Sequence, residues 1–362
     1  MAFDVSKKML EVYKEEADPK MGFLTSFFKT KPQYITDSEE IEYDIVRSGA
    51  PIAPVLTDVS TGAHVISKEV FTNKTIKPPT FVLQEPFSRW DMGKRQPGET
   101  VYGASTGNTM IKLAGKLVDS WKRMSDMVRR TIELQAAQIL QTGTITLYNS
   151  ANVAAYTLDF KMKATHLPTV GTSWSNGAAD IIGDIKAACE VVRKDGRCNI
   201  KTLLMDDLSF TNALNNTLFA NLFKKDQFNL GALNPSWGGV GETYQGFVII
   251  GSYRLDIYTY PVTYTSIAGA ETKYLSDNKV IGLPDMNELD FRKCFGGIPD
   301  PIAQEAEFVS MMPSRIVEGN NLVWVPRIFS DPVKNAVYSE LASRPILIPV
   351  SIDRFFCITT LH

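Results

Sequence analysis

The chain has 362 residues, a formal net charge of -2 and a pI of about 6.0. Hydrophobic residues make up 44% and charged residues 22%, a balance typical of a folded protein, which argues against a disordered chain. A protein that binds nucleic acid over a broad face is usually basic, so this charge does not favour that class. Low net charge leaves little repulsion between copies and permits dense self-association.

Neither secretion nor membrane insertion is indicated. The first residues contain no apolar signal core, and no apolar run approaches the roughly 20 residues that span a bilayer. We therefore expect a protein made and kept in a cytoplasm, with no membrane partner. The four cysteines lack a CxxC or zinc spacing, so we expect free thiols and neither a metal nor another cofactor. They are Cys189, Cys198, Cys294 and Cys357.

The first part of the chain has few residues that could form a core of their own. Residues 5–16 have the apolar spacing of a short amphipathic helix, and an apolar FLTSFF cluster follows at residues 23–28. Residues 40–45 alternate as a strand does. A segment like this packs on its own body or reaches onto a neighbour. Phe23, Phe27 and Phe28 are therefore candidate contacts between subunits.

Residues 55–99 are rich in Val, Ile and Thr and have turn signals at Thr61–Gly62 and Pro78–Pro79. This pattern predicts a long two-stranded ribbon, which is marginal in water without support from elsewhere. Lys68, Lys74 and Lys77 lie on it. They could contact the acidic groups of a neighbour, or they could be a solvated strand edge where lysine discourages stray pairing.

A very long helix is the clearest element of the sequence. Residues 109–141 contain no proline, and Gly143 follows them. One apolar stripe runs through the segment with a polar break at Gln135, so we expect the helix to lie along a surface and not to cross a core. Its length would be about 50 Å, more than twice that of the usual globular helix.

The remaining chain alternates between strand and helix patterns, which predicts a mixed sheet flanked by helices. A hairpin comes first and is followed by two helices with one strand between them. Asp207 is expected to cap the second helix. Further strands and a glycine-rich loop at residues 229–241 follow. The tail from residue 322 onward alternates again and suggests a domain that recruits the C-terminus. The ranges are 144–147 with 155–162, helices 178–194 and 207–214, and strands 200–205, 247–250, 255–260, 273–275 and 279–283.

Three stretches resemble chemical motifs. Residues 103–107 fit GxSxG around Ser105, but the preceding RQPGETVY is polar and turn-rich where a nucleophile elbow needs a buried strand. Residues 237–241 are glycine-rich but lack the GK[ST] of a phosphate loop. Residues 285–290 lack the central glycine and terminal glutamate of a calcium loop. A linker and two surface loops are therefore favoured over catalysis and ion binding.

The order of these parts resembles the major capsid fold of tailed bacteriophages, and the local sequence resembles the lambda-type major head protein family, major capsid protein E. The resemblance covers nearly the whole chain and is least clear at about residues 206–300. The stretches that carry it, in chain order, are residues 23–28 (FLTSFF), 52–56 (IAPVL), 77–83 (KPPTFVL), 133–143 (ELQAAQILQTG), 157–160 (TLDF), 172–175 (TSWS) and 331–355.

This resemblance implies an α+β, Hong Kong phage-like fold and a non-enzymatic head protein. The protein would assemble as pentamers and hexamers into an icosahedral virion shell around double-stranded DNA, which it would touch without base readout. Scaffold, portal and cement proteins would be further partners. The implied parts are an N-terminal arm 1–55, an E-loop 56–98, a peripheral domain 99–176 with the spine helix 109–141, an axial domain 177–318 and C-terminal strands 319–362 returning to the peripheral domain.

Two other functions remain open from the sequence. An encapsulin-like nanocompartment would use the same fold to enclose enzymes instead of DNA. A serine hydrolase would use Ser105 as its nucleophile. For the capsid hypothesis, we expect that deleting residues 1–31 leaves a soluble subunit that fails to assemble.

Overall fold

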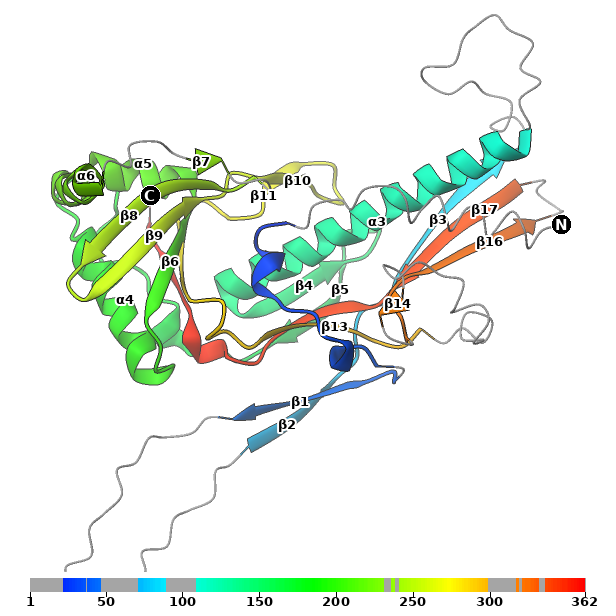
Figure 1. Cartoon of the computed structure of the whole chain (residues 1–362), viewed down its shortest axis with the longest axis horizontal. Coiled ribbons are helices and arrows are strands. Elements are labelled where there is room, and N and C mark those ends of the chain that lie inside the picture. The colour runs from blue at the N-terminus through cyan, green and yellow to red at the C-terminus, as the bar shows by residue number, and fades with distance from the viewer. Residues whose placement is uncertain are drawn as a thin grey trace, which may run out of the picture.

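The structure is a computed structural model that describes residues 22–36, 38–46, 71–88, 109–230, 236–237, 241–298, 317–318, 321–331 and 336–361. The described chain is elongated (Figure 1). A sheet with helices α4, α5 and α6 forms one end, the long helix α3 runs to the other, and a two-stranded ribbon projects from the region between them. The expected helix at 5–16 and Lys68 lie outside the described residues.

Helix α3 (Thr109–Thr142) confirms the long helix, and its 34 residues correspond to about 50 Å. It ends at Gly143, which adopts a φ of 69° and donates its N–H to Ile139 O at 2.8 Å. The expectation that the whole helix lies along a surface is wrong for its C-terminal half. There, side chains on every face are buried, including Glu133, Ala137 and Leu140. Residues 132–141 contain one charged side chain, Glu133, so neighbouring segments can close over the helix from every side.

A three-stranded antiparallel sheet of order β16-β17-β3 packs against α3. Its strands are β3 (Phe81–Ser88), β16 (Val325–Asp331) and β17 (Ala336–Ser343). The C-terminal part of the chain thus pairs with a strand about 250 residues earlier, with Leu83 opposite Leu341. Along β3, exposure alternates from residue to residue, so one face of the sheet lies on α3 and the other faces outward.

The projecting ribbon differs from the expected one. Strand β1 (Ile41–Val46) pairs antiparallel with β2 (Phe71–Ile76), with Ile41 opposite Ile76. The segment assigned to the arm therefore supplies one ribbon strand. The Pro78–Pro79 stretch does not turn the chain back on itself but leads it into β3, in another sheet. The alternating patterns identified the strands, whereas their pairing depends on contacts that no local pattern encodes.

The sheet at the other end has six strands in the order β19-β12-β6-β9-β8-β7, and only β6 and β9 pair in parallel. One face of this sheet packs with α4 in a core of its own, whereas Leu204, Ile281 and Cys357 on the other face belong to the core around α3. This confirms the expected mixed sheet flanked by helices. The strands are β6 (Ile200–Met205), β7 (Ser236–Trp237), β8 (Thr243–Ile250), β9 (Tyr253–Thr259), β12 (Lys279–Pro284) and β19 (Phe356–Thr359).

Helices α4 (Ile181–Asp195), α5 (Asp207–Asn215) and α6 (Thr217–Leu230) accompany this sheet. The first two match the expected helices, whereas α6 was not expected. The N-cap of α5 is Asp206 and not Asp207, because the Asp206 carboxylate accepts from Ser209 N at 2.9 Å. Most of the loop expected at 229–241 lies outside the described residues.

The C-terminal strands are shared between both ends of the molecule. Strand β18 (Pro345–Pro349) pairs with β13 (Phe291–Phe295) beside α3, whereas β19 joins the six-stranded sheet next to β12. They do not all return to the body around α3, so the expected division at residue 319 does not describe them.

Three further pairs of short strands complete the described fold. Strands β4 (Thr144–Tyr148) and β5 (Ala154–Asp159) confirm the expected hairpin. The other pairs are β10 (Thr263–Thr265) with β11 (Glu271–Lys273), and β14 (Val317–Glu318) with β15 (Asn321–Leu322).

Candidate assembly surfaces

The first described residues of the arm bind a buried carboxylate in the C-terminal half of α3. Glu133 accepts from Leu24 N at 2.8 Å, from Thr25 N at 2.9 Å, from Thr25 Oγ1 at 2.5 Å and from Tyr260 OH at 2.8 Å. A Cβ on Gly22 would collide with this carboxylate, which its four hydrogen bonds hold in place, so glycine is favoured there. Burial and the carboxylate together raise the pKa of Tyr260, which keeps it a hydrogen-bond donor. Glu133 therefore holds the first described residues of the arm, Gly22 to Thr25, against α3.

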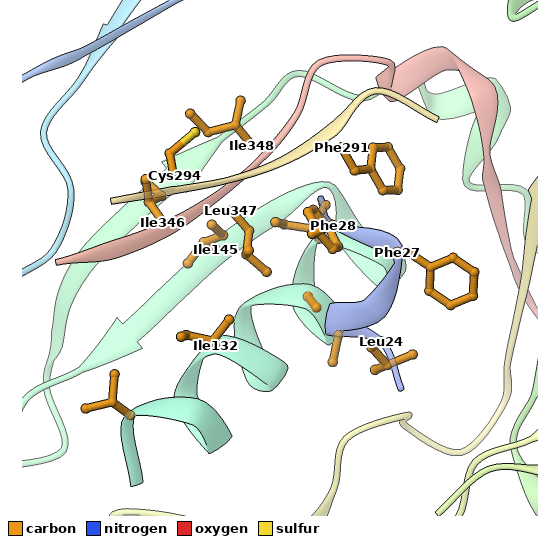
Figure 2. Packing of buried hydrophobic residues seen from close by; sticks show 14 of the residues in the cluster. Leu24, Phe27, Phe28, Ile132, Ile145, Phe291, Cys294, Ile346, Leu347 and Ile348 are labelled. Carbon is orange, nitrogen blue, oxygen red and sulfur yellow. The ribbon is translucent and has the colours of Figure 1, made fainter. Parts of the chain in front are cut away.

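The three aromatic rings predicted at subunit contacts are placed against their own chain. Phe27 and Phe28 are buried, and the Phe28 ring stacks on Phe291 with centroids 4.9 Å apart. Phe23 packs edge-on against Phe27 at 5.3 Å. Figure 2 shows Leu24, Phe27 and Phe28 on a short turn between α3 and the β13–β18 pair. Their apolar surface is thus used inside one subunit.

The base of the ribbon is held by one buried arginine. Arg344 donates to Gly297 O at 2.6 Å and to both Glu39 O and Pro78 O at 3.2 Å. Its guanidinium therefore joins the start of β1, the exit from β2 and the segment after β13. Because the planar fork serves three carbonyls at once, the two ribbon strands leave the body from a fixed point.

The predicted lysines are now partly located. Lys77 lies at the ribbon base, with Nζ 3.4 Å from Glu39 Oε1 and 3.3 Å from Glu40 Oε1. These two carboxylates raise its pKa, and the side chain is 62% exposed. Lys74 lies on β2 opposite Tyr43. Lys77 therefore meets acids of its own chain in a contact that solvent weakens.

An open groove of about 760 Å³ lies beside the ribbon base. It runs between the arm, the start of β1 and the β13–β18 pair, and three of its lining residues are glutamates. Arg292 lines it too, but its guanidinium is held by Asp290, with Nη2 2.7 Å from Oδ2. The groove is therefore polar and acidic. Its full lining is Gln33, Tyr34, Thr36, Ser38, Glu39, Glu40, Ile41, Glu42, Tyr43, Arg292, Cys294 and Ile348.

The outer face of the three-stranded sheet carries exposed apolar side chains. Val82 is 51% exposed and Phe329 is 42% exposed, and the Phe329 ring stacks on Tyr338 at 5.2 Å. On the other face, Glu85 accepts from Ser120 Oγ at 2.7 Å and pairs with Arg123 of α3. The sheet is thus attached to the helix by one face, and the other presents apolar surface of the kind found at protein contacts.

The chemical motifs gain no support. Ser105 lies outside the described residues, and so does most of the glycine-rich stretch at 237–241. Asp285 and Asp290 are used by Lys201 and Arg292 of their own chain. Within the described ranges, no group of three His, Cys, Asp or Glu side chains could hold a metal ion. All four cysteines are free and buried, and their burial raises the pKa of each thiol.

Sequence reasoning missed Glu133 and Arg344. Glu133 sits one position off the apolar stripe of α3, where a glutamate is ordinarily solvated. Its one local signal is that residues 134–140, which follow it, contain no charged residue. Arg344 lies in a C-terminal strand region, and nothing near it indicates its three distant carbonyl partners.

Among the described helices, none has the length and apolar character to cross a bilayer.

A family model described as phage major capsid protein E matches residues 7–356. The structure is similar to that of a protein described as a prophage capsid protein of E. coli CFT073, at 16% identity and a TM-score of 0.65, with 98% of each chain covered. The capsid of Myoviridae phage XM1 matches at 9% identity and TM-score 0.46, covering 96% of this chain and 95% of that one.

An encapsulin from Synechococcus elongatus PCC 7942 matches at 10% identity and TM-score 0.41, with 96% and 92% covered. No curated protein sequence matches. The family match extends over nearly the whole chain and agrees with the arm, the long helix and the mixed sheet described above. The chain belongs to the phage major capsid protein E family and is a shell protein of a phage head, with the Hong Kong phage-like fold.

Proposed function

We propose that this chain assembles as pentamers and hexamers into an icosahedral head that encloses double-stranded DNA. The observation that carries the proposal is the ribbon, which projects from the body on the Arg344 anchor (Figure 1). An isolated two-stranded ribbon is marginal in water, so a neighbouring subunit would supply the burial that it lacks. Folding and assembly would then be partly one event.

The proposed contacts between subunits are the ribbon and the outer face of the β16-β17-β3 sheet. Lys68, Lys74 and Lys77 remain candidates on the ribbon side. Phe27 and Phe28 are no longer proposed as contacts between subunits, because both are buried in their own subunit. Val82 and Phe329 are proposed instead, because both are exposed. Many weak contacts repeated around a closed shell would together hold it.

The first test is negative-stain electron microscopy of the protein expressed alone, with its size-exclusion profile. Closed shells, tubes or rings support the proposal. A monomer near 40.2 kDa calls for co-expression with neighbouring genes, because such a subunit would need its scaffold. A monomer that persists under co-expression contradicts the proposal.

Variants of Phe329 test the sheet face. Phe329→Glu places a charge on the exposed apolar surface and would block assembly, whereas Phe329→Leu keeps that surface apolar and would assemble. Both would retain the wild-type circular dichroism spectrum, because the ring lies outside the core. Normal shells from Phe329→Glu would remove this face from the proposal.

The structure changes the deletion that best tests the role of the N-terminal arm. Deleting residues 1–31 would remove Leu24, Phe27 and Phe28 from the core, so loss of assembly would then reflect unfolding. Deleting residues 1–21 leaves the contact with Glu133 intact. We expect a folded subunit that assembles poorly, and normal shells from this deletion would remove the arm from the proposal.

The proposed content of the shell separates a phage head from a nanocompartment. We propose that the shell encloses double-stranded DNA and contacts it without recognising its bases. Shells purified from their natural source would yield nuclease-sensitive DNA; enzyme cargo in its place would favour the encapsulin-like alternative. No observation on the described residues favours a hydrolase at Ser105. Scaffold, portal and cement proteins remain proposed partners, and assembly in the host cytoplasm remains a proposal.

A further inference from the structure

Four residues of α3 stand four positions apart and form one row along one side of the helix. They are Trp121, Ser125, Arg129 and Glu133. Glu133 already accepts four hydrogen bonds, three of them from the arm. The other three residues carry buried donor atoms that have no hydrogen-bond partner among the described residues. These atoms are Trp121 Nε1, Ser125 Oγ, and Arg129 Nε and Nη1. We call Trp121, Ser125 and Arg129 the donor row.

The chemistry of the donor row is one-sided. An indole N–H and a guanidinium can only donate, and a serine hydroxyl can donate as well. Buried polar groups in folded proteins are nearly always hydrogen-bonded, because an unmade bond leaves the cost of removing the group from water uncompensated. Carboxylate oxygens are the acceptors that suit a guanidinium best. The donor row therefore fits an acidic partner.

The described groups around Arg129 do not fill this role. The carboxylate of Asp126 is 3.9 Å from Arg129 Nη1, which is too long for a hydrogen bond. The guanidinium also lies over the ring of Trp324, 6.0 Å from its centroid, and this contact leaves two of its nitrogen atoms unpaired. Arg129 thus retains two buried donor atoms for a further segment of chain.

The arm meets α3 at one end of this row. Its first described residue, Gly22, lies against Glu133, which follows Arg129 by about one helical turn, or about 6 Å along the axis. The sequence just before Gly22 is acidic, since residues 15–18 are EEAD. Asp18 is four residues from Gly22, a span of up to about 14 Å. The three carboxylates of this stretch are therefore within reach of the donor row.

We propose that the donor row is the docking site for residues 15–21 of the same chain, with the carboxylates of residues 15–18 as its acceptors. One carboxylate would accept from both Nε and Nη1 of Arg129, and the others would accept from Ser125 and Trp121. The arm would then follow α3 for about three turns beyond Glu133. Residues 1–14 would remain available to a neighbouring subunit, and the docking itself does not depend on the proposed shell.

Disulfide trapping in the full-length protein, in its purified assembly state, tests where the segment lies. Ala17→Cys combined with Asp126→Cys places one thiol within the acidic stretch and the other beside Arg129. The control combines Ala17→Cys with Met127→Cys. Met127 is 46% exposed and lies two positions from both Ser125 and Arg129, on the opposite side of the helix. The native cysteines are buried and should not compete.

Oxidation with copper phenanthroline should close a disulfide within one chain in the first pair, at least about tenfold faster than in the control pair, because docking raises the effective concentration of the two thiols. Non-reducing gel electrophoresis separates this product from a linked dimer, and peptide mass spectrometry locates the bond. A linked dimer would overturn the assignment, since the arm of a second copy would then occupy the row. Equal rates in the two pairs would overturn the docking altogether.

Limited trypsin digestion after Lys20 gives a second measurement that introduces no thiol. Arg129→Met keeps a long apolar side chain but removes the donors, so cleavage should become about tenfold faster, the size expected for one lost charge-assisted bond. Arg130→Met changes the next residue, whose side chain is exposed, and should be cleaved at the wild-type rate. Equal rates in Arg129→Met and Arg130→Met would contradict the proposal.

A variant of the arm guards against misfolding of the body. Its changes are E15Q, E16Q and D18N. They leave α3 unaltered and remove the three proposed acceptors. Cleavage after Lys20, taken relative to cleavage of the same chain in its unfolded state, should again rise about tenfold. A wild-type ratio in this variant would overturn the proposal.

Discussion

Glu133 Oε1 lies 2.8 Å from the backbone nitrogen of Leu24, although 109 residues separate the two in the sequence. This bond joins the first described turn of the arm to the C-terminal half of α3. The carboxylate is buried and accepts from neutral donors alone, so each of its bonds offsets part of the cost of burying a charge. The arm is thus held by a polar anchor as well as by its aromatic rings.

Glu133→Gln should detach this anchor. The amide would face backbone N–H groups with its own NH₂, leaving donors unpaired, at a cost of roughly 1.5–3 kcal/mol in the free energy of unfolding. Chemical denaturation measures the loss of stability, and limited trypsin digestion after Lys29 reports release of the arm. Glu42→Gln, on an exposed side chain of the ribbon, is the control and should match wild type. Wild-type stability in Glu133→Gln would show that the anchor is unimportant.

Phe28→Ala and Phe329→Ala form a matched pair. The first removes a buried ring stacked on Phe291 and should lower the free energy of unfolding by about 3–5 kcal/mol. The second removes an exposed ring from the outer sheet face and should cost less than about 1 kcal/mol, because little of its surface leaves water on folding of the subunit. Thermal unfolding of both variants measures the two losses of stability. Equal losses would contradict the placement of Phe28 in the core.

Arg344→Met should loosen the base of the ribbon. Three carbonyl oxygens, on Glu39, Pro78 and Gly297, would lose their donor, for a loss on the order of 3 kcal/mol. Hydrogen exchange should rise in residues 38–46 and 71–80 and stay unchanged in the six-stranded sheet. Arg123→Met is the control, because Arg123 is 61% exposed and its partner Glu85 is also partly solvated. Exchange that rises equally in both sheets would indicate general unfolding instead.

The cysteines should resist thiol reagents in the folded protein. Burial raises the pKa of Cys189, Cys294 and Cys357 to about 12 and that of Cys198 to about 11, so the reactive thiolate is scarce at pH 8. Labelling with iodoacetamide should therefore require denaturant, after which all four react. Rapid labelling of the native protein would contradict the burial of these side chains.

The same shifts predict a stability change in alkali. The unfolded chain releases its thiol protons near the ordinary cysteine pKa, whereas the folded chain keeps them to about pH 11–12. The unfolded state therefore binds fewer protons in this window, so stability should fall as the pH rises from about 9 towards 12. Denaturation curves at several alkaline pH values check the direction. Serine substitution of Cys198, the least shifted thiol, should reduce this slope slightly.

Local patterns in the sequence determined the long helix, the β4–β5 hairpin, most strands of the mixed sheet and the order of parts that resembles a capsid protein. These features depend on periodicity, caps and turn residues within a few positions of one another, and α3 ends at Gly143 for that reason. The sequence also indicated that the part before α3 needs support.

Tertiary structure alone decided which segments meet. It paired β1 with β2 and β3 with β17, moved Phe27 and Phe28 from a neighbour's surface into the chain's own core, and brought Glu133 and Arg344 to their distant partners. A strand pattern specifies which residues face inward but not which strand lies alongside. A lone buried charge has no period to reveal it, because its partners are backbone groups more than 40 residues away.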